Sequence, residues 1–190
     1  MKTFKKDEVK NLILSKYASP IGELTLCSDY KNLVGLWLKN QKFFGSGYNL
    51  TKAAFYKESD NLEIFKKVNL WLDEYFKGKN PEIKELPLKP EGSDFRKSVW
   101  KILCKIPYGK TVTYNDIAKE IARSKNINKM SAQAVGGAIG HNPISIIIPC
   151  HRVVGANKNL TGYASGISAK IALLKLEKVD VDNFIVPNNL

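Results

Sequence analysis

The sequence predicts an α+β protein: a small N-terminal sheet with one helix, followed by a mostly helical C-terminal domain that is winged helix-turn-helix-like. Three observations lead to this fold class. Apolar residues alternate through much of 17–39, they recur at helical spacing in 61–76, and several short helical patterns follow a proline-rich stretch at 80–93. A chain of 190 residues is long enough to bury a core without the help of disulfides.

The first element is expected to be a β-hairpin or meander over residues 17–39. Residues 17–26 alternate between apolar and polar side chains, the pair Ser28-Asp29 supplies a turn, and residues 33–38 are apolar again. Alternation of this kind is typical of strands that bury one face. We therefore expect a small sheet in the N-terminal half.

One helix is expected next, over residues 61–76. Its apolar side chains recur at helical spacing, at Leu62, Phe65, Leu72 and Phe76. Gly78 and Pro81 end the pattern, because neither residue continues a helix easily. The pair Lys66-Lys67 is expected on the solvent-exposed face of this helix.

A linker is expected at residues 80–93. This stretch holds three prolines and one glycine, which exclude a long regular element. The patterns on its two sides differ in kind, since strands with one helix precede it and several helices follow it. We therefore place a domain boundary near Leu88, which divides the chain into an N-terminal domain of residues 1–88 and a C-terminal domain of residues 89–190.

The C-terminal domain is expected to contain a helix-turn-helix. A supporting helix capped by Ser93 or Asp94 presents one apolar stripe, formed by Phe95, Val99, Ile102, Leu103 and Ile106. The capping-box sequence at 113–116 predicts the start of a short helix. A polar loop at 123–129, longer than the motif usually has, leads to a second helix from about Ser131.

The helix from Ser131 consists almost entirely of small residues, Ser-Ala-Gln-Ala-Val-Gly-Gly-Ala-Ile-Gly. Each glycine costs a helix about 1 kcal/mol relative to alanine, so Gly136 and Gly137 need a reason. Two interpretations account for the pattern about equally well. One is tight packing between helices, and the other is a slim helix that fits a narrow DNA groove.

The net charge of +12 is typical of a protein with a polyanionic partner. Because 27 of the 30 basic residues are lysine, a compositional bias of the whole genome accounts for the charge as well. The distribution adds a little information. Residues 1–88 carry 15 basic and 11 acidic groups, whereas residues 89–190 carry 15 and 7, so the excess lies mainly in the C-terminal half.

The cysteines predict a reducing, cytoplasmic setting. Cys27, Cys104 and Cys150 are an odd number at long spacings, which fits neither a disulfide framework nor a secreted protein. No metal is expected, because the chain has only two histidines, His141 and His151, and no CxxC or HxxxH spacing. No membrane association is expected either, since no apolar run approaches the roughly 20 residues of a membrane span.

The strongest candidate for chemistry is Cys150, which follows Pro149 at the end of an apolar run expected to be a buried strand. A thiol becomes a useful nucleophile beside a base or a positive charge, and His151 and Arg152 supply both. By itself, a cysteine after several isoleucines is more often a small core residue. Since neighbours on an extended strand point to opposite faces, a proton relay between Cys150 and His151 through one water is the expected geometry.

These residues resemble a known family. The sequence Pro149-Cys-His-Arg-Val153 after Asn142-Pro143, with Ala134-Val-Gly-Gly137 upstream, strongly resembles the O6-alkylguanine-DNA alkyltransferases. The likeness extends from Tyr17 to about Val179. It implies a ribonuclease H-like N-terminal domain and, as partner, double-stranded DNA that contains O6-alkylguanine. It further implies minor-groove binding, base flipping, and irreversible single-turnover transfer of the alkyl group to Cys150, by a monomer without a cofactor.

The resemblance also implies roles for individual residues. Cys150 is the expected nucleophile, His151 is the base that takes its proton through water, and Glu177 orients the imidazole. Tyr114 is expected to offset charge on the leaving guanine, and Asn142 to hold the backbone around the cysteine. Contacts to the DNA or the flipped base are expected from Gln133, Ala132, Ala134, Gly136, Arg152, Val153, Tyr163 and Ser165.

One departure from the family and three rival interpretations remain open. Gln133 stands where the family often has an arginine, which predicts weaker DNA affinity with base extrusion retained. The non-enzymatic alkyltransferase-like class lacks the nucleophilic cysteine, so Cys150 argues against it. The remaining two rivals are a winged-helix transcription factor and a Cys-His hydrolase. The sequence does not rank methyl against larger alkyl groups or show whether O4-alkylthymine is accepted.

Overall fold

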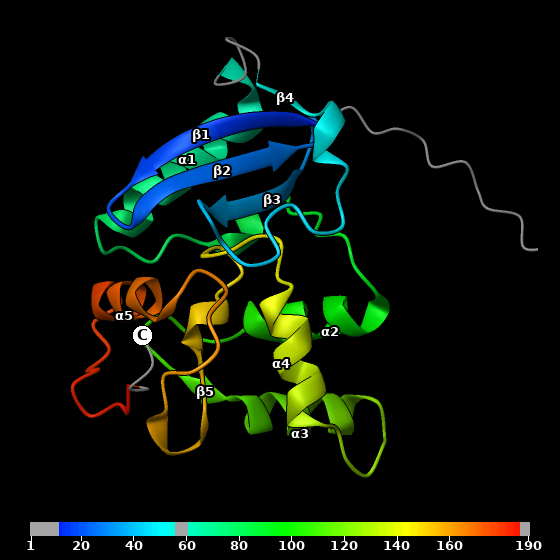
Figure 1. Cartoon of the computed structure of the whole chain (residues 1–190), viewed down its shortest axis with the longest axis vertical. Coiled ribbons are helices and arrows are strands. Elements are labelled where there is room, and N and C mark those ends of the chain that lie inside the picture. The colour runs from blue at the N-terminus through cyan, green and yellow to red at the C-terminus, as the bar shows by residue number, and fades with distance from the viewer. Residues whose placement is uncertain (1–11, 56–60, 187–190) are drawn as a thin grey trace, which may run out of the picture.

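The computed structural model describes residues 12–55 and 61–186, and places a strand-rich N-terminal half against a helical C-terminal half (Figure 1). This arrangement confirms the predicted α+β class. The N-terminal elements are β1 (Ile13–Ser19), β2 (Gly22–Ser28), β3 (Leu33–Leu38), η1 (Leu50–Lys52), β4 (Ala54–Phe55) and α1 (Glu63–Phe76). The later elements are η3 (Ile83–Glu85), α2 (Asp94–Leu103), β5 (Val112–Thr113), α3 (Tyr114–Ser124), α4 (Ala132–Gly140), η4 (Cys150–Arg152), β6 (Val153–Val154), η5 (Ala156–Lys158) and α5 (Ile167–Leu176).

The N-terminal sheet has the strand order β3-β2-β1-β4. β1, β2 and β3 form the predicted antiparallel meander, and β4 pairs with β1 in parallel. No turn was predicted within residues 17–26, where the structure has one at Pro20 and Ile21 that separates β1 from β2. Gly22, with a φ of 116°, lets the chain reverse there. Alternation of side chains continues through such a tight turn, so the pattern alone did not reveal it.

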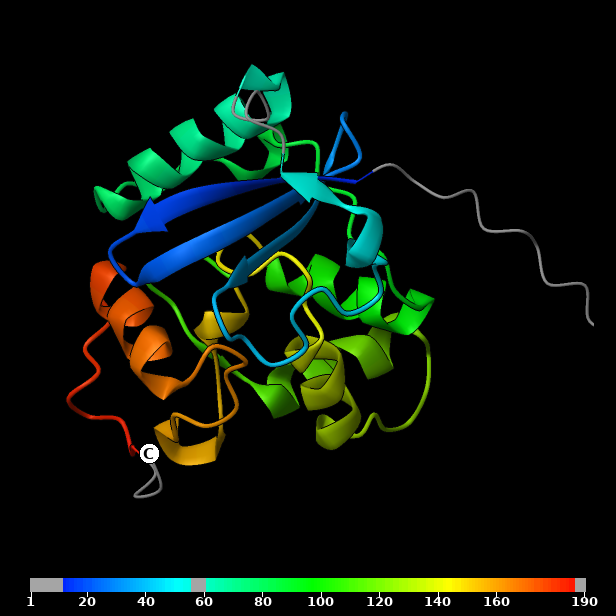
Figure 2. The same cartoon turned by 45° about the horizontal axis from the view of Figure 1, so that its top comes forward.

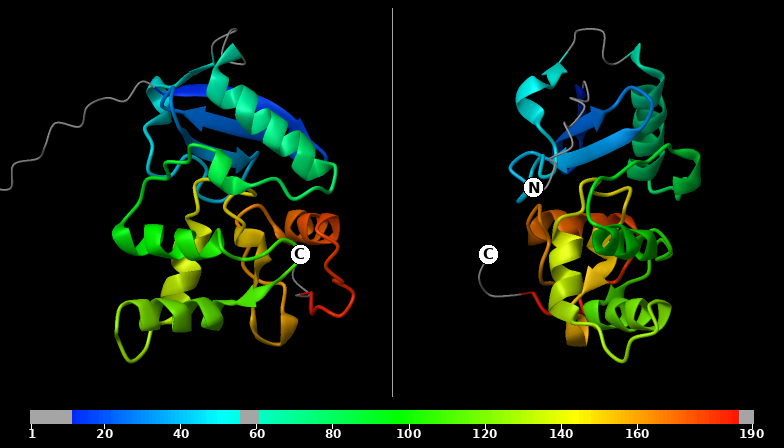
Figure 3. Two further views of the ribbon diagram at one scale, coloured as in Figure 1. Left: turned by 180° about the vertical axis from the view of Figure 1, so that it is seen from behind. Right: turned by 90° about the vertical axis from the view of Figure 1, so that its right-hand side faces the viewer.

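The two faces of the sheet are covered by different segments. α1 lies along one face (Figures 2 and 3), where alternate strand residues such as Leu24 and Leu26 are fully buried. The opposite side chains, among them Cys27 and Trp37, pack with residues from the segment between β3 and β4. Because apolar side chains pack on both faces of the sheet, β3 is buried along its whole length.

The outer edge of β3 joins the two halves of the molecule. Leu33 exchanges backbone hydrogen bonds with the 87–89 segment, donating to Pro87 O and accepting from Lys89 N, each at 2.9 Å. Leu36 does the same further along, donating to Pro143 O and accepting from Ser145 N, each at 2.8 Å. An otherwise unpaired sheet edge is thereby satisfied. The pairing docks the chain just before Cys150 against the N-terminal sheet, while the boundary near Leu88 stays a prediction.

The C-terminal helices begin at the residues that their sequences predict. Ser93 caps α2 by accepting a hydrogen bond from Arg96 N, and Ser131 caps α4 in the same way. The capping box of Thr113 and Asp116 opens α3. α3 and α4 pack against each other and against α2, as Figure 1 shows, which confirms the helix-turn-helix pattern.

The apolar run before Cys150 is not a strand, contrary to the prediction. It is a buried turn in which Ile146 adopts a φ of 71°, a left-handed conformation that is uncommon for a β-branched residue. A single-turn 3₁₀ helix, η4, then carries Cys150. The isoleucines reflect burial between the two halves of the molecule, which produces the same apolar composition as a buried strand.

No helix among residues 12–55 and 61–186 is long and apolar enough to cross a membrane.

Candidate active site

Cys150 lies almost completely buried at the start of η4, on a turn held by Asn142. The Asn142 amide nitrogen donates to Ile148 O at 2.8 Å and to Cys150 Sγ at 3.2 Å, and its carbonyl oxygen accepts from Ile144 N at 3.1 Å. These bonds brace the left-handed turn at Ile146 from inside. One buried side chain thus fixes the backbone before the cysteine and also contacts the sulfur.

His151 is fully buried and is held through one nitrogen. Its Nε2 lies 2.7 Å from Glu177 Oε1, whereas its Nδ1 is buried with no hydrogen-bond partner among the described residues. Because Glu177 is ionised, Nε2 carries the proton and Nδ1 is left as the acceptor. Burial lowers the pKa of His151, against a rise caused by Glu177, so the imidazole is neutral and able to take up a proton.

Glu177 is the C-cap residue of α5 and the centre of a buried polar cluster. Besides His151, it accepts hydrogen bonds from the Tyr75 hydroxyl at 2.8 Å, from Arg152 Nε at 2.9 Å and from Gly109 N at 3.1 Å. Burial alone raises the pKa of Glu177, but the His151 and Arg152 contacts outweigh it and lower the pKa to about 2. The carboxylate therefore stays ionised at any physiological pH.

The side chains of Arg152 and Val153, two residues expected to contact DNA or the flipped base, are buried. The Arg152 guanidinium is buried, bonded to Glu177 and, through Nη1, to Ile106 O at 2.6 Å. Val153 is buried in β6, paired with Val112. Successive side chains on a 3₁₀ turn point about 120° apart, so neighbours of Cys150 in sequence face different parts of the molecule. Arg152 is thus placed as a partner of Glu177.

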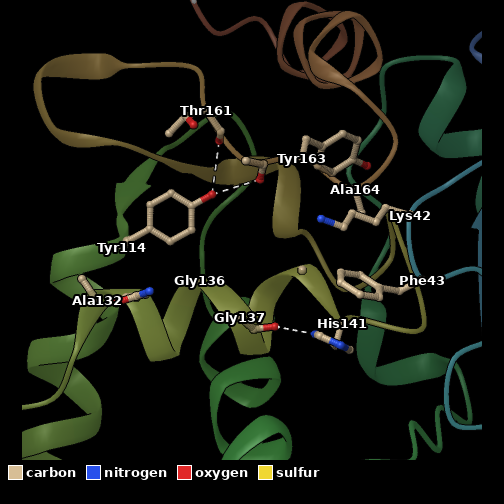
Figure 4. A pocket seen from close by; sticks show the side chains of 13 residues that line it. Lys42, Phe43, Tyr114, Ala132, Gly136, Gly137, His141, Thr161, Tyr163 and Ala164 are labelled. Atoms are coloured by element: carbon tan, nitrogen blue, oxygen red, sulfur yellow. Dashed lines mark hydrogen bonds between the residues drawn. The ribbon is translucent and has the colours of Figure 1, made fainter.

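A cavity of about 540 Å³ lies between α4 and the loop at 161–164 (Figure 4). Tyr114 stands at one end, and side chains of the N-terminal half stand at the other. Tyr114 lines it, together with four of the residues expected to contact the DNA or the flipped base: Ala132, Gln133, Gly136 and Tyr163. Ala134 is exposed on α4 outside the lining, and the Ser165 hydroxyl instead donates to Gln41 Oε1 at 2.9 Å.

Two tyrosines place hydroxyl groups near the cysteine. The Tyr114 hydroxyl donates to Gly162 O at 3.0 Å and Thr161 O at 3.2 Å, as Figure 4 shows. Burial and the nearby Cys150 raise the pKa of Tyr114 to about 12, and they raise that of Tyr163 further, so both phenols keep their protons. A Cβ on Gly162 would lie 2.6 Å from the Tyr114 hydroxyl, which is why the loop needs glycine there.

The glycines of α4 face the cavity and do not pack tightly against another helix. A Cβ on Gly137 would have no heavy atom within 4 Å, and one on Gly136 would make only ordinary contact with the Tyr114 ring at 3.7 Å. The opposite face of α4 packs into the core through Val135, Ala138 and Ile139. Of the two interpretations of this helix, close packing therefore does not account for Gly136 and Gly137.

The sequence reasoning missed Lys170. This lysine is fully buried, donates from Nζ to Thr161 O at 2.8 Å and lies near Cys150. Burial lowers the pKa of Lys170 to about 8, against a smaller rise from Cys150. A signal was present in the sequence, because Leu173 and Leu174 follow Lys170 at helical spacing and put it on the buried face of α5.

Tyr75 was also missed. The apolar stripe of α1 was assigned to Phe76, but the buried face follows Phe65, Val68, Leu72 and Tyr75. Tyr75 is 1% exposed, and its hydroxyl reaches both Glu177 and His151, at 2.8 Å and 3.3 Å. The N-terminal half therefore contributes a side chain to the polar cluster behind the cysteine.

The three cysteines are free thiols in different surroundings. Burial raises the pKa of Cys27 to about 12 and that of Cys104 to about 11, which is typical of thiols that serve as packing. Burial raises the pKa of Cys150 too, but the Asn142 hydrogen bond and the Lys170 charge act in the opposite direction. Within the described residues, no group of three or more histidine, cysteine or acidic side chains gathers as a metal site.

Comparison with known proteins relates both halves of the chain to one family. Residues 12–90 match the family model described as 6-O-methylguanine DNA methyltransferase, ribonuclease-like domain. Residues 94–179 match the model described as 6-O-methylguanine DNA methyltransferase, DNA binding domain.

Individual relatives agree with these matches. The chain is 46% identical over 161 residues to a methylated-DNA–protein-cysteine methyltransferase of Methanosarcina barkeri, covering 84% of this chain and 93% of the relative. It is 38% identical over 168 residues to that of Haemophilus influenzae, covering 88% and 87%. Among solved structures, Mycobacterium tuberculosis OGT in complex with DNA is similar with a TM-score of 0.71 and 37% identity, covering 92% of this chain and 94% of that one.

Proposed function

This chain belongs to the methylated-DNA–protein-cysteine methyltransferase family, and we propose that it repairs O6-alkylguanine in double-stranded DNA by a single, irreversible alkyl transfer to Cys150. One observation carries the proposal. A buried cysteine contacts Asn142, and the histidine next to it has one nitrogen held by a carboxylate and the other free to accept a proton. This is the arrangement that an activated thiol needs.

The transfer is a displacement at an sp³ carbon. His151 Nδ1 takes the thiol proton through one water, and the imidazolium that forms is stabilised by Glu177. The Cys150 thiolate then forms a bond to the alkyl carbon while the bond from that carbon to guanine O6 breaks. The electron pair leaves with the guanine, and a hydroxyl donor such as Tyr114 offsets the charge developing on the ring. The product is a thioether. Water does not break its bond between the alkyl carbon and the sulfur under mild conditions, so each chain reacts once.

The target carbon is buried in stacked DNA, so the base must leave the duplex before attack. Extrusion costs a few kcal/mol, which binding in a fitted pocket offsets. The cavity beside Tyr114 and Tyr163 supports this step, because about 540 Å³ lies within the usual range for small-ligand pockets. α4, with Gly136 and Gly137 toward that cavity, is slim enough to lie in the minor groove, which is only about 6 Å wide.

The proposal includes a monomer that acts in the cytoplasm without a cofactor. Tyr75, Asn142, Cys150, His151 and Glu177 all come from one chain, which supports a monomer. The reaction consumes a free thiol, and a reducing compartment such as the cytoplasm keeps cysteines in that state. All three cysteines of the chain are free thiols.

The defining test is to incubate the protein with a duplex that contains one O6-methylguanine and to measure the mass of the protein. We expect one methyl group per chain, located on Cys150, and activity that ends at one equivalent. The variant Cys150→Ser should fold and gain no methyl group. Sustained turnover would indicate a hydrolase instead, and binding without any adduct would indicate a DNA-binding protein such as a transcription factor.

Gln133→Arg is expected to bind the same duplex more tightly than the parent does. Gln133 is exposed on α4 at the cavity, where an arginine would add a positive charge close to the DNA backbone. The gain should shrink as salt rises, because each phosphate contact releases counterions. Equal affinities for the two proteins across a salt series would contradict the expectation, and Gln133→Leu serves as a control without added charge.

A further inference from the structure

The loop after β3 brings the N-terminal half of the molecule to the cavity. Lys42 and Phe43 line the cavity together with Tyr163, as Figure 4 shows. Gln133 belongs to the same lining. The loop therefore faces the same space as the helix-turn-helix, although it lies about a hundred residues away in sequence. No role follows for it from the alkyl transfer itself.

This loop is firmly attached to the active site. Lys42 N donates to Ala164 O at 2.9 Å, in the loop that covers the cavity. The neighbouring Gln41 is buried, and its Oε1 accepts hydrogen bonds from the Ser145 and Ser165 hydroxyls, each at 2.9 Å. Ser145 precedes Cys150 on the same buried turn. The backbone at Lys42 is thus fixed to both sides of the site.

The side chain of Lys42 is placed by a stack of rings. Its Nζ lies 5.1 Å from the centroid of the Phe43 ring, and that ring stacks on His141 with centroids 3.9 Å apart. His141 is the C-cap of α4, where its Nδ1 lies 2.8 Å from Gly137 O. A cation held over an aromatic ring keeps its three hydrogen-bond donors. Across the described part of the chain, Lys42 is exposed and forms no ion pair with an acidic side chain.

On the basis of the proposed function, we propose that Lys42 binds a phosphate of the DNA strand that carries the extruded nucleotide. A nucleotide that enters the cavity brings its own phosphates to the rim, where Lys42 stands. Gln133, which lines the same cavity from α4, carries no charge. The N-terminal half therefore supplies, at this cavity, the positive charge that α4 lacks at Gln133.

The test measures the salt dependence of DNA binding in a Cys150→Ser background, so that no transfer takes place. The probe is a duplex with one O6-methylguanine, and the variant is Lys42→Gln. We expect the slope of log K against log salt to become less steep by about 0.9, the value for one phosphate contact. Between 50 and 200 mM salt, the ratio of the DNA affinity of the protein with Lys42 to that of the Lys42→Gln variant should then fall about threefold to fourfold.

Lys31→Gln is the matched control. It removes the same charge from an exposed position in the turn before β3, at the end of that strand opposite to Lys42. Its slope should equal that of the parent, and Lys42→Arg should also keep the parent slope. If Lys42→Gln and Lys31→Gln change the slope equally, or if neither changes it, the proposal is overturned.

A second measurement separates this proposal from the proposed function. With Cys150 intact, transfer from free O6-benzylguanine, which has no phosphate, tests the proposed function on the parent protein alone. Lys42→Gln is compared with the parent only in its affinity for DNA. Replacing the phosphates that flank the lesion with neutral methylphosphonates should remove the difference in affinity between the two proteins. If the parent transferred no alkyl group from either the free base or the duplex, the proposed function would be refuted. The salt slopes would still show whether Lys42 contacts a phosphate.

Discussion

Glu177→Gln is expected to lower the free energy of unfolding by about 3–5 kcal/mol, the usual cost of removing one partner of a buried ion pair. The substitution keeps the size of the side chain but leaves the Arg152 guanidinium buried without its counterion. It also removes the carboxylate that holds His151 Nε2. Alkyl transfer should therefore fall strongly even at temperatures at which the variant is folded, because the imidazole loses its fixed tautomer.

The pH dependence of stability gives this prediction a sharper form. The folded protein holds the pKa of Glu177 at about 2, below its ordinary value of 4.5. A carboxyl whose pKa is lowered by folding stabilises the protein above the ordinary value, and this contribution is lost as pH falls through the folded value. The difference in stability between parent and variant should thus be full above pH 4.5 and shrink between about pH 4.5 and about pH 2.

Chemical denaturation at several pH values measures both effects. Glu74→Gln is the control, since Glu74 pairs with the exposed Lys77 and Lys79 on the surface, where ion pairs contribute little. It should leave stability and transfer unchanged. A Glu177→Gln variant with parental stability at neutral pH would show that the buried cluster does not depend on this carboxylate.

Lys170→Met is expected to slow transfer at pH 7 by about tenfold for each unit by which it raises the pKa of Cys150. The methionine fills much of the same space but removes the positive charge of Lys170, which lowers the pKa of the Cys150 thiol against the effect of burial. A smaller fraction of thiolate then faces the alkyl carbon. The rate of transfer from free O6-benzylguanine measures the effect without contributions from DNA binding.

The loss should depend on pH in a defined direction. Below about pH 8, Lys170 is protonated in the parent and favours the thiolate, whereas above that value it loses its charge. The ratio of parental to variant rates should therefore be largest below pH 8 and decline above it. Lys175→Met, an exposed position on the same helix, should match the parent throughout. A ratio that does not change with pH would mean that Lys170 acts only by holding Thr161.

Much of the fold was predictable because it depends on local interactions. The caps at Ser93, Thr113 and Ser131 satisfy backbone groups within three residues, so their sequences alone indicate where the helices begin. The alternation in the N-terminal half likewise predicts a meander, since the side chains on one strand face are decided by a period of two. The turn at Pro20 escaped this reasoning because the alternation continues across it.

The site was predictable to a lesser degree. Resemblance pointed to Cys150, His151 and Glu177, and the structure brings the latter two within 2.7 Å of each other. The resemblance assigned Arg152 to DNA contacts, whereas the structure buries its side chain against Glu177. Nothing in a linear sequence indicates which way a side chain points from a 3₁₀ turn. Lys170 and Tyr75 were missed because a polar group on a buried helix face looks like an exception to the core pattern.

The sequence by itself determined the α+β class, the helix-turn-helix and the presence of a cysteine with an adjacent base. Only the tertiary structure decided that the isoleucines before Cys150 form a turn, that Arg152 pairs with Glu177, and that Tyr75 and Lys42 reach the site from the N-terminal half. The physical reason is the distance in sequence over which each feature is stabilised. Caps and amphipathic patterns act within a few residues, whereas these contacts exist only once β3 has docked the two halves together.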